Sequence, residues 1–461
     1  MQISKIELKE YNQFKNVVFD FTYPKGHADE GKPLKKICVI GQSGTGKTSM
    51  LRLIKYFVSR NKQIGPNLHL PSIVKGNVYF EIYQGDIFSR KTSNGINMLV
   101  ELALKGGKKL PAEEYLKETA KYENSKLPLL INYPAEVVRG NMNNDKSKNE
   151  EETVVKIKRR IEAIEILQPK QIVDFAVEEI EKISDFVLKK IKEHRAQDLL
   201  HKQQIADVVL KEGSDPKQIS VVNKKYEKWL KENANPLEKL AKECLDPILN
   251  TFGLRVKTKM DLDSILALGD IQLETLQGVE VPRPLWSTGT RHIVDSALPL
   301  FELKPKDAVI LMDEPEKSLY PDMQEKIIDF YCGLAPKCQF FFATHSHIVA
   351  SAFDPWEVFH LEYDEASKHV QLVPNYHGEK HIDNYDYYPK YLRWDSILMK
   401  MFKITDEGNE ERNKLLVKQA TINDQLENMM KNGKTESAQF TKLKEGYISL
   451  KKKTGWNAEN R

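Results

Sequence analysis

The stretch "KKICVIGQSGTGKTSMLRLI" (residues 35–54) decides the fold, because it joins three patterns that one kind of site needs together. A short apolar run ends at Ile40, the glycine-rich segment "GQSGTGKT" follows at 41–48, and a helix pattern continues from Ser49. The segment matches GxxxxGK[S/T], and a strand before it with a helix after it is the context that this pattern requires. We therefore predict a phosphate-binding loop, with a chance match in a glycine-rich turn as the alternative.

The predicted loop supplies the groups that a nucleoside triphosphate needs. Its glycines let backbone N–H groups surround phosphate oxygens, and the N-terminus of the following helix adds positive potential. Lys47 is expected to reach the β- and γ-phosphates, and the Thr48 hydroxyl is expected to bind Mg²⁺. ATP and Mg²⁺ are therefore the predicted cofactors. The predicted nucleotide-binding residues of the loop are Gly41, Gln42, Ser43, Gly44, Thr45, Gly46, Lys47, Thr48 and Ser49.

A pair of carboxylates follows a second apolar run, in "AVILMDEPEKSLYP" (308–321). A buried parallel strand that ends in carboxylates places them where an open α/β sheet presents its ligands. We expect Asp313 to hold Mg²⁺ through water and Glu314 to orient or deprotonate the attacking water. The alternative is an ordinary acidic turn before a helix, and the phosphate-binding loop favours the catalytic interpretation.

A third apolar run, "CQFFFATHSHIVAS" (338–351), ends in two histidines. It lies one strand–helix–strand step beyond Asp313, which suits a neighbouring strand of the same sheet. A neutral histidine there would donate to a γ-phosphate, and His345 is the better candidate, with His347 the weaker one. The alternative is a solvated or capping histidine.

The segment "PLWSTGTRHI" (284–293) precedes a further helix pattern. Ser287 or Thr288 is a suitable N-cap for that helix. A helix N-terminus with a nearby glycine, Gly289, is also suited to an anion, so the segment is predicted to be a cap with a candidate phosphate-binding role.

Composition places the chain among soluble proteins. Its 461 residues carry a net charge of +4, and the basic clusters are interleaved with glutamates, so solvated helix faces explain them better than a polyanion partner. The four cysteines form no CxxC pair, which is typical of reduced thiols in a cytosol. No stretch approaches the length of a membrane span, and the N-terminus lacks the apolar core of a signal peptide. We therefore expect a cytoplasmic location and no membrane partner.

The rest of the chain alternates between strand-like and helical segments. Alternating apolar positions predict two strands within residues 1–23, and apolar residues at three- and four-residue steps from Ile172 predict a compact helical lobe over about 152–250. The tail predicts a helical pair broken at Asn432-Gly433. The expected domains are residues 1–140 (N-terminal part of a nucleotide-binding head), 141–269 (helical insertion), 270–375 (C-terminal part of the head) and 376–461 (C-terminal helical region).

These motifs, in this order, resemble those of ABC-type ATPase heads, and in particular the RecF/SMC-like and OLD-like bacterial AAA ATPases. The resemblance rests on the phosphate-binding loop, "STGTRHIVDSALPLF", "VILMDEPE" and "ATHS", and it covers roughly residues 1–135 and 270–375. It implies an α/β P-loop NTPase head with a mixed, largely parallel sheet, a helical insertion and a C-terminal helical region. It also implies a homodimer or higher homo-oligomer, in which the loop of one subunit and Ser287 and Gly289 of another enclose ATP.

Three positions depart from the usual pattern of such heads: Trp286, Thr288 and Tyr320. They bear on the rate of hydrolysis, not on nucleotide binding. Two features of the family stay open on the sequence alone. Gln84 is a candidate for the glutamine that contacts Mg²⁺, and the candidates for stacking on adenine are Tyr11, Phe14 and Phe19.

The resemblance also implies a function. The residues after His345 are lysine-rich and helical in pattern, so we expect no nuclease domain of the OLD kind in this chain. Anti-phage systems of the PARIS and Septu kind pair such an ATPase with a separate effector. The expected function is an ATP-binding and ATP-hydrolysing switch that controls a nuclease or toxin. The alternative is a DNA-maintenance ATPase of the RecF/SMC kind that clamps DNA, so direct contact with nucleic acid stays open.

Overall fold

The computed structural model describes most of the chain outside its long connectors. The described residues are 2–59, 78–84, 87–93, 98–104, 130–135, 172–175, 178–210, 216–259, 271–402 and 410–454. They divide into two compact units, Met1–Trp394 and Asp395–Arg461. In this part of the chain, no helix combines the length and the apolar character that crossing a membrane requires.

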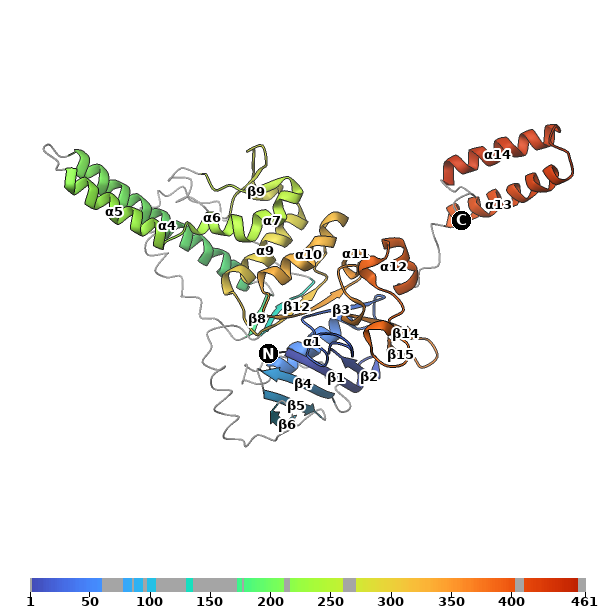
Figure 1. Cartoon of the computed structure of the whole chain (residues 1–461), viewed down its shortest axis with the longest axis horizontal. Coiled ribbons are helices and arrows are strands. Elements are labelled where there is room, and N and C mark those ends of the chain that lie inside the picture. The colour runs from blue at the N-terminus through green and yellow to red at the C-terminus, as the bar shows by residue number, and fades with distance from the viewer. Residues whose placement is uncertain are drawn as a thin grey trace, which may run out of the picture. The chain divides into compact units, whose positions relative to one another are not determined.

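A mixed twelve-stranded sheet runs through the first unit (Figure 1). Six neighbouring strands, from β14 to β8, are parallel, and the strands from β6 to β2 are antiparallel. The predicted α/β head with a mixed, largely parallel sheet is therefore confirmed. In spatial order the strands are β6 (Met98–Leu104), β5 (Ile87–Ser93), β4 (Val78–Gln84), β1 (Gln2–Tyr11), β2 (Phe14–Asp20), β15 (His369–Val373), β14 (Val358–Asp364), β3 (Lys36–Gly41), β13 (Gln339–Thr344), β12 (Val309–Asp313), β7 (Leu130–Tyr133) and β8 (Ile172–Asp174).

Helices cover both faces of the parallel strands (Figure 1). Helix α1 (Lys47–Ser59) buries Met50, Leu53 and Ile54 in one apolar core with alternate residues of the strands, such as Leu311 and Phe341. Because successive strand residues point to opposite faces, the residues between them pack on the other side, toward α9 (Thr288–Leu303) and α10 (Pro321–Leu334). A sheet covered on both faces explains why these strands are continuous apolar runs.

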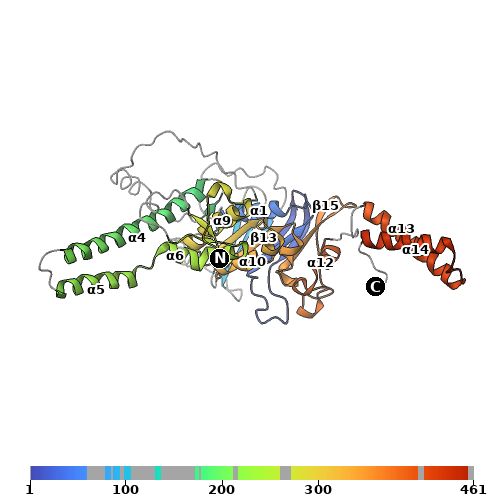
Figure 2. The same ribbon diagram turned by 90° about the horizontal axis from the view of Figure 1, so that it is seen from above.

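A long helical hairpin projects from this head (Figures 1 and 2). Helix α4 (Glu178–Leu210) spans 33 residues, and α5 (Pro216–Glu232), which lies against it, has no buried residue. The Tyr226 hydroxyl of α5 donates to Asp198 Oδ1 of α4 at 2.6 Å and joins the two helices. The predicted compact lobe is therefore wrong. The first turns of α4 pack against α9 and bury Ile183, Val187 and Ile191, whereas the part of α4 that pairs with α5 extends beyond this contact.

Part of that predicted helical segment is a strand, and its residues 152–171 lie outside the described part of the structure. Ile172 begins β8, the edge strand that pairs with β7, and helix α4 begins at Glu178. A three-residue segment with two apolar residues fits the helical period and the strand period equally well, so only the neighbouring strand decides between them.

Smaller elements complete the first unit. They are α6 (Pro236–Leu240), a π-helix (Ala241–Leu245), α7 (Asp246–Leu249), the strands β9 (Leu254–Val256), β10 (Leu273–Thr275) and β11 (Glu280–Val281), α11 (His347–Ala350), and 3-10 turns at Asn250–Phe252, Arg283–Leu285, Pro355–Glu357, Ile382–Asn384 and Pro389–Tyr391. The domain boundary expected at residue 376 lies before the division at Trp394, because the 3-10 turns after β15 belong to the first unit.

The second unit contains the predicted helical pair. Helices α13 (Glu410–Lys431) and α14 (Ala438–Thr454) are joined by a turn at Asn432–Gly433, after α12 (Trp394–Met401) (Figure 2). The glycine has a left-handed φ of 66°, as expected for the residue that ends a helix. Leu426 and Leu450 are buried, whereas Val417 and Met430 are exposed.

A buried carboxylate lies near the start of β14. Glu357 is 4% exposed, and its Oε2 accepts from the Asp354 N–H at 2.8 Å and lies 3.6 Å from Lys36 Nζ. Burial raises the pKa of Glu357 to about 7, against the opposing effect of the Lys36 charge. The folded protein therefore binds this proton more tightly than the unfolded chain does.

We predict that Glu357 makes the fold less stable as pH rises from about 5 to 8. A folded-state pKa near 7, above the unfolded value, favours the folded state at low pH, by about 3 kcal/mol relative to high pH. Glu357→Gln keeps an oxygen acceptor for the Asp354 N–H but does not titrate. In urea titrations at each pH, wild-type stability minus that of Glu357→Gln should fall by that amount across the window. A difference independent of pH would contradict the prediction.

Candidate functional site

The phosphate-binding loop forms as predicted, between the end of β3 at Gly41 and the start of α1 at Lys47. Gly41 and Gly46 have φ angles of 152° and 90°. A Cβ atom on Gly46 would lie 2.2 Å from Gln13 Nε2, and one on Gly41 would lie 2.3 Å from Leu361 O. The backbone of β14 therefore excludes a side chain at Gly41, and at Gly46 a side chain is disfavoured by the left-handed φ and by Phe14 Cζ, 2.7 Å from the Cβ position.

The other loop residues divide into an exposed tip and an anchored base. Gln42, Ser43 and Gly44 are exposed, whereas Thr45 is buried and its hydroxyl donates to Gln42 O at 2.8 Å. Gln13, in the turn between β1 and β2, donates from Nε2 to Gly44 O at 3.3 Å. Gln13 was not predicted, because nothing in its sequence context marks that turn as a neighbour of the loop.

Lys47 lies folded across its own loop. Its Nζ donates to Gly41 O at 2.8 Å and to Gln42 O at 3.0 Å, and it lies 3.3 Å from His345 Nδ1. Burial lowers the pKa of Lys47 to about 8, against the charges of Asp313 and Glu314, which raise it. The ammonium group is thus held among acceptors in a partly dehydrated place, which is where a phosphate gains most from it.

The predicted Mg²⁺ ligands lie in direct contact. The Thr48 hydroxyl donates to Asp313 Oδ2 at 2.8 Å, from the first turn of α1 to the last residue of β12. Burial raises the pKa of Asp313, and the hydrogen bond from Thr48 opposes that shift. A hydroxyl and a carboxylate are the oxygen donors that Mg²⁺ prefers, so this pair fits the ion.

The two remaining predicted catalytic residues follow adjacent strands. His345 comes directly after β13, and Glu314 comes directly after β12, its neighbour. Partial burial and the charge of Lys47 lower the pKa of His345, so its imidazole is neutral at pH 7. Glu314 has a left-handed φ of 52°, and its N–H donates to Ala343 O at 2.8 Å, so the chain turns sharply there. His347 instead begins α11.

The Ser287 segment is a helix cap, as predicted. Ser287 Oγ accepts from the Thr290 N–H at 3.0 Å at the start of α9. Trp286 is buried, and its indole N–H donates to Val281 O at 2.9 Å, which explains a tryptophan at this position.

The structure explains the glycine at position 289 by a contact that the sequence did not suggest. We expected this glycine to let a phosphate approach the backbone. A Cβ atom at Gly289 would instead lie 2.5 Å from Ser318 O of the same chain. The close approach that excludes a side chain is therefore between α9 and the segment that follows Glu314.

The candidates for adenine stacking are wrong. Tyr11, Phe14 and Phe19 are 2%, 0% and 0% exposed, and they pack on one another in the core beneath the sheet. Phe14 and Phe19 are five positions apart, so strict alternation would place them on opposite faces of β2, yet both are buried. Gln84 is the last residue of β4, and its side chain lies outside the described part of the structure.

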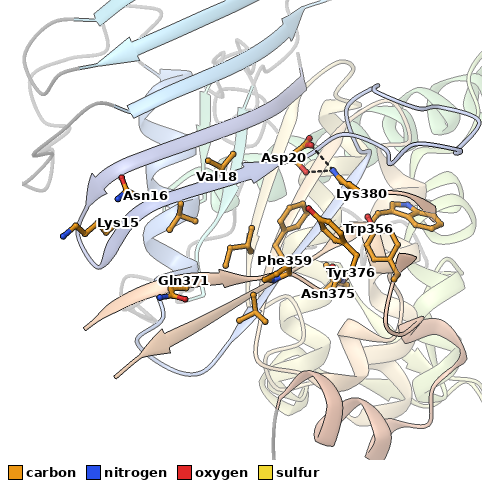
Figure 3. Close-up of a pocket in the computed structure, with 16 residues that line it drawn as sticks. Lys15, Asn16, Val18, Asp20, Trp356, Phe359, Gln371, Asn375, Tyr376 and Lys380 are labelled. Atoms are coloured by element: carbon orange, nitrogen blue, oxygen red, sulfur yellow. Dashed lines mark hydrogen bonds and ion pairs between the residues drawn. The ribbon is translucent and has the colours of Figure 1, made fainter. Parts of the chain in front are cut away.

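A separate cavity of about 440 Å³ lies between β2 and the β14–β15 hairpin (Figure 3). Strands β2 and β15 pair only at Phe14 and Val370, and Lys380 closes the far end by donating to Asp20 O and Thr22 O at 2.8 and 2.7 Å. None of the predicted nucleotide-binding residues lines it. The candidate nucleotide site is therefore the loop and strand ends described above.

Comparison with known proteins shows the family. The model of the AAA ATPase domain family matches residues 1–350, so the chain belongs to that family. No curated protein sequence matches it. The chain is also similar to three solved SMC heads, and 81% of this chain is covered in each comparison. The head bound to the C-winged helix domain of ScpA is 14% identical and covered over 97% of its length, with a TM-score of 0.41. The head from Pyrococcus furiosus with an extended coiled coil is 14% identical, covered over 96%, with a TM-score of 0.38, and the head from Thermotoga maritima is 12% identical, covered over 99%, with a TM-score of 0.37. These TM-scores are too low to support an argument, and the fold rests on the topology above.

We predict that Gly289→Ala destabilises the protein by about 1–3 kcal/mol, because the new methyl group would overlap Ser318 O and force α9 away from it. The matched control is Gly333→Ala in α10, where no atom lies within 4 Å of the new Cβ and helix propensity should stabilise by up to about 1 kcal/mol. Urea unfolding followed by circular dichroism measures both. Equal stability of the two variants would show that the contact is unimportant.

Proposed function

We propose that this AAA ATPase domain protein is an ATP-binding and ATP-hydrolysing switch that dimerises head-to-head on ATP and controls a separate effector. The observation that supports it most is the meeting of Lys47, His345 and the Thr48–Asp313 pair at the ends of three adjacent strands. Residues separated by up to 298 positions in the sequence come into hydrogen-bond distance there, and each is of the type that triphosphate chemistry needs.

Each of these residues would have a separate role in hydrolysis. A triphosphate bound on the loop would draw Lys47 Nζ from the Gly41 and Gln42 carbonyls to its own oxygens. Thr48 and Asp313 would hold Mg²⁺, which when bound neutralises charge on the β- and γ-phosphates. Glu314 would orient and deprotonate the attacking water, and neutral His345 would donate to the γ-phosphate.

A second subunit would complete the site with the N-terminus of α9, including Ser287 and the backbone at Gly289. The surface there supports a protein partner, because large apolar side chains flank the cap on both sides. Leu285 is 74% exposed before it, and Tyr320 is 71% exposed beyond Ser318, which touches Gly289. Exposed apolar groups gathered at one place are typical of interfaces.

The proposed biological role is bacterial anti-phage defence, with a nuclease or toxin as effector. Two described surfaces suit such a partner: the α4–α5 hairpin, whose second helix buries nothing, and the α13–α14 pair, which exposes Val417 and Met430. Tight, salt-sensitive and ATP-dependent DNA binding by the purified protein alone would favour the DNA-clamping alternative instead.

We predict that Glu314→Gln lowers kcat by at least about 100-fold, because it removes the base that activates water while leaving the phosphate ligands in place. The variant should bind ATP and accumulate as a dimer in light scattering after size-exclusion chromatography. The control is Lys47→Ala, which should neither bind ATP nor dimerise. A Glu314→Gln protein that holds ATP yet stays monomeric would exclude the sandwich.

We also predict that two inactive variants restore activity when mixed. Lys47→Ala damages the loop and Ser287→Arg blocks the α9 cap, so a mixed dimer contains one intact composite site if the two parts come from different subunits. An equimolar mixture should then release phosphate that neither variant releases alone, at up to about half of the wild-type rate, since each mixed dimer has one good site of two. Colorimetric phosphate release measures it. If both parts of a site come from one subunit, the mixture stays inactive.

A further inference from the structure

A second carboxylate of the "DEPE" segment is buried, and no role above uses it. Glu316 is 9% exposed, and its Oε1 accepts a hydrogen bond from the Thr344 hydroxyl at the end of β13. Its other oxygen, Oε2, is buried without a hydrogen-bond partner among the described residues. Burial raises the pKa of Glu316, and the hydrogen bonds from the Thr344 hydroxyl and from the backbone N–H groups of Glu316 and His345 oppose that shift.

The partner of Glu316 stands directly before His345. The Thr344 hydroxyl donates to Glu316, and its Oγ1 accepts from the Ser346 N–H at 2.8 Å. The residues on both sides of His345 are thus tied to one carboxylate through one hydroxyl. The Ser346 hydroxyl in turn donates to Gln324 Oε1 of α10 at 2.6 Å, which anchors the far side of the segment.

Packing alone does not explain a carboxylate at this position. A buried acid with one unsatisfied oxygen costs free energy that a neutral or apolar side chain of similar size would avoid. A carboxylate does polarise the Thr344 hydroxyl, which strengthens the bond from the Ser346 N–H in series with it. The result is a stiff backbone on both sides of His345.

We propose that Glu316 is the positioning residue of His345: through Thr344 and Ser346 it holds the imidazole beside Lys47 Nζ, where the γ-phosphate binds. This inference rests on the proposed ATPase function. It joins two strand ends within one site, since Glu316 lies in the turn just after β12, which ends at Asp313, and its hydrogen bond reaches the end of β13. The histidine would then be set by the same segment that carries the metal ligand and the base.

The test compares kcat and the Kd of ATP for wild type, Glu316→Leu, His345→Ala and the double variant. Glu316→Leu should lose kcat as strongly as His345→Ala, by about 100-fold, with the Kd of ATP changed by less than about threefold. The double variant should be no slower than His345→Ala alone, because Glu316 acts only through that histidine. Losses that multiply would overturn the inference, since they would show that the two residues act independently.

Two further variants keep the test decisive if Glu316→Leu folds poorly. Thr344→Val removes the same hydrogen bond from its other end and should reproduce the loss, whereas Thr344→Ser retains the hydroxyl and most of the rate. Glu316→Gln keeps an oxygen for the Thr344 hydroxyl and should retain more activity than Thr344→Val. A Thr344→Val protein with wild-type kcat would overturn the inference.

The same assay distinguishes failure of the proposed ATPase function from failure of the positioning role of Glu316. If wild-type phosphate release is no greater than that of Lys47→Ala, the proposed ATPase function fails. If wild type hydrolyses ATP in a Lys47-dependent way and the Glu316 and His345 losses multiply, only the positioning role fails.

Discussion

The site depends on three parallel strands, β3, β13 and β12, that lie side by side and end at one edge of the sheet. Parallel strands place every carboxyl end on the same side, so whatever follows each strand meets there. The phosphate-binding loop, His345 and Asp313 follow these three strands in that order. The Thr48–Asp313 hydrogen bond then spans β13 from one side to the other, which only the first turn of α1 can do.

Burial and neighbouring charges together set the pKa values of Lys47 and His345 at this edge of the sheet. Burial lowers the pKa of Lys47, while Asp313 and Glu314 raise it, and the result is about 8. Lys47 in turn helps to lower the pKa of His345, which leaves a neutral imidazole beside a cation. Two side-chain nitrogens therefore converge where the proposed γ-phosphate would bind, and only one of them is positively charged.

Much of this geometry was predictable, because the motifs carry their own local structure. The loop pattern specifies a strand before it and a helix after it, and a strand–helix–strand step places β12 beside β13. Contacts made by segments distant in sequence were not predictable. Ile172 satisfied a helical period but pairs with β7, and Phe14 and Phe19 are buried by a layer that their own alternation cannot reveal. Nothing local to Glu316 indicates its hydrogen bond to Thr344, because the two residues are 28 positions apart in the sequence.

Gly289 shows how the two halves of the proposed composite site are linked within one chain. Its lack of a side chain lets Ser318 O approach α9, and His292, one turn later, lies with Nε2 3.2 Å from Pro315 O. The segment that begins with Asp313, the proposed metal ligand, therefore contacts α9 directly, the helix whose N-terminus would face a partner subunit in the proposed dimer. Such packed contacts are stiff, so a shift of Asp313 or Glu314 on nucleotide binding would move the α9 cap with it. Through this contact, a nucleotide bound to one subunit would shift the α9 surface that this subunit presents to its partner.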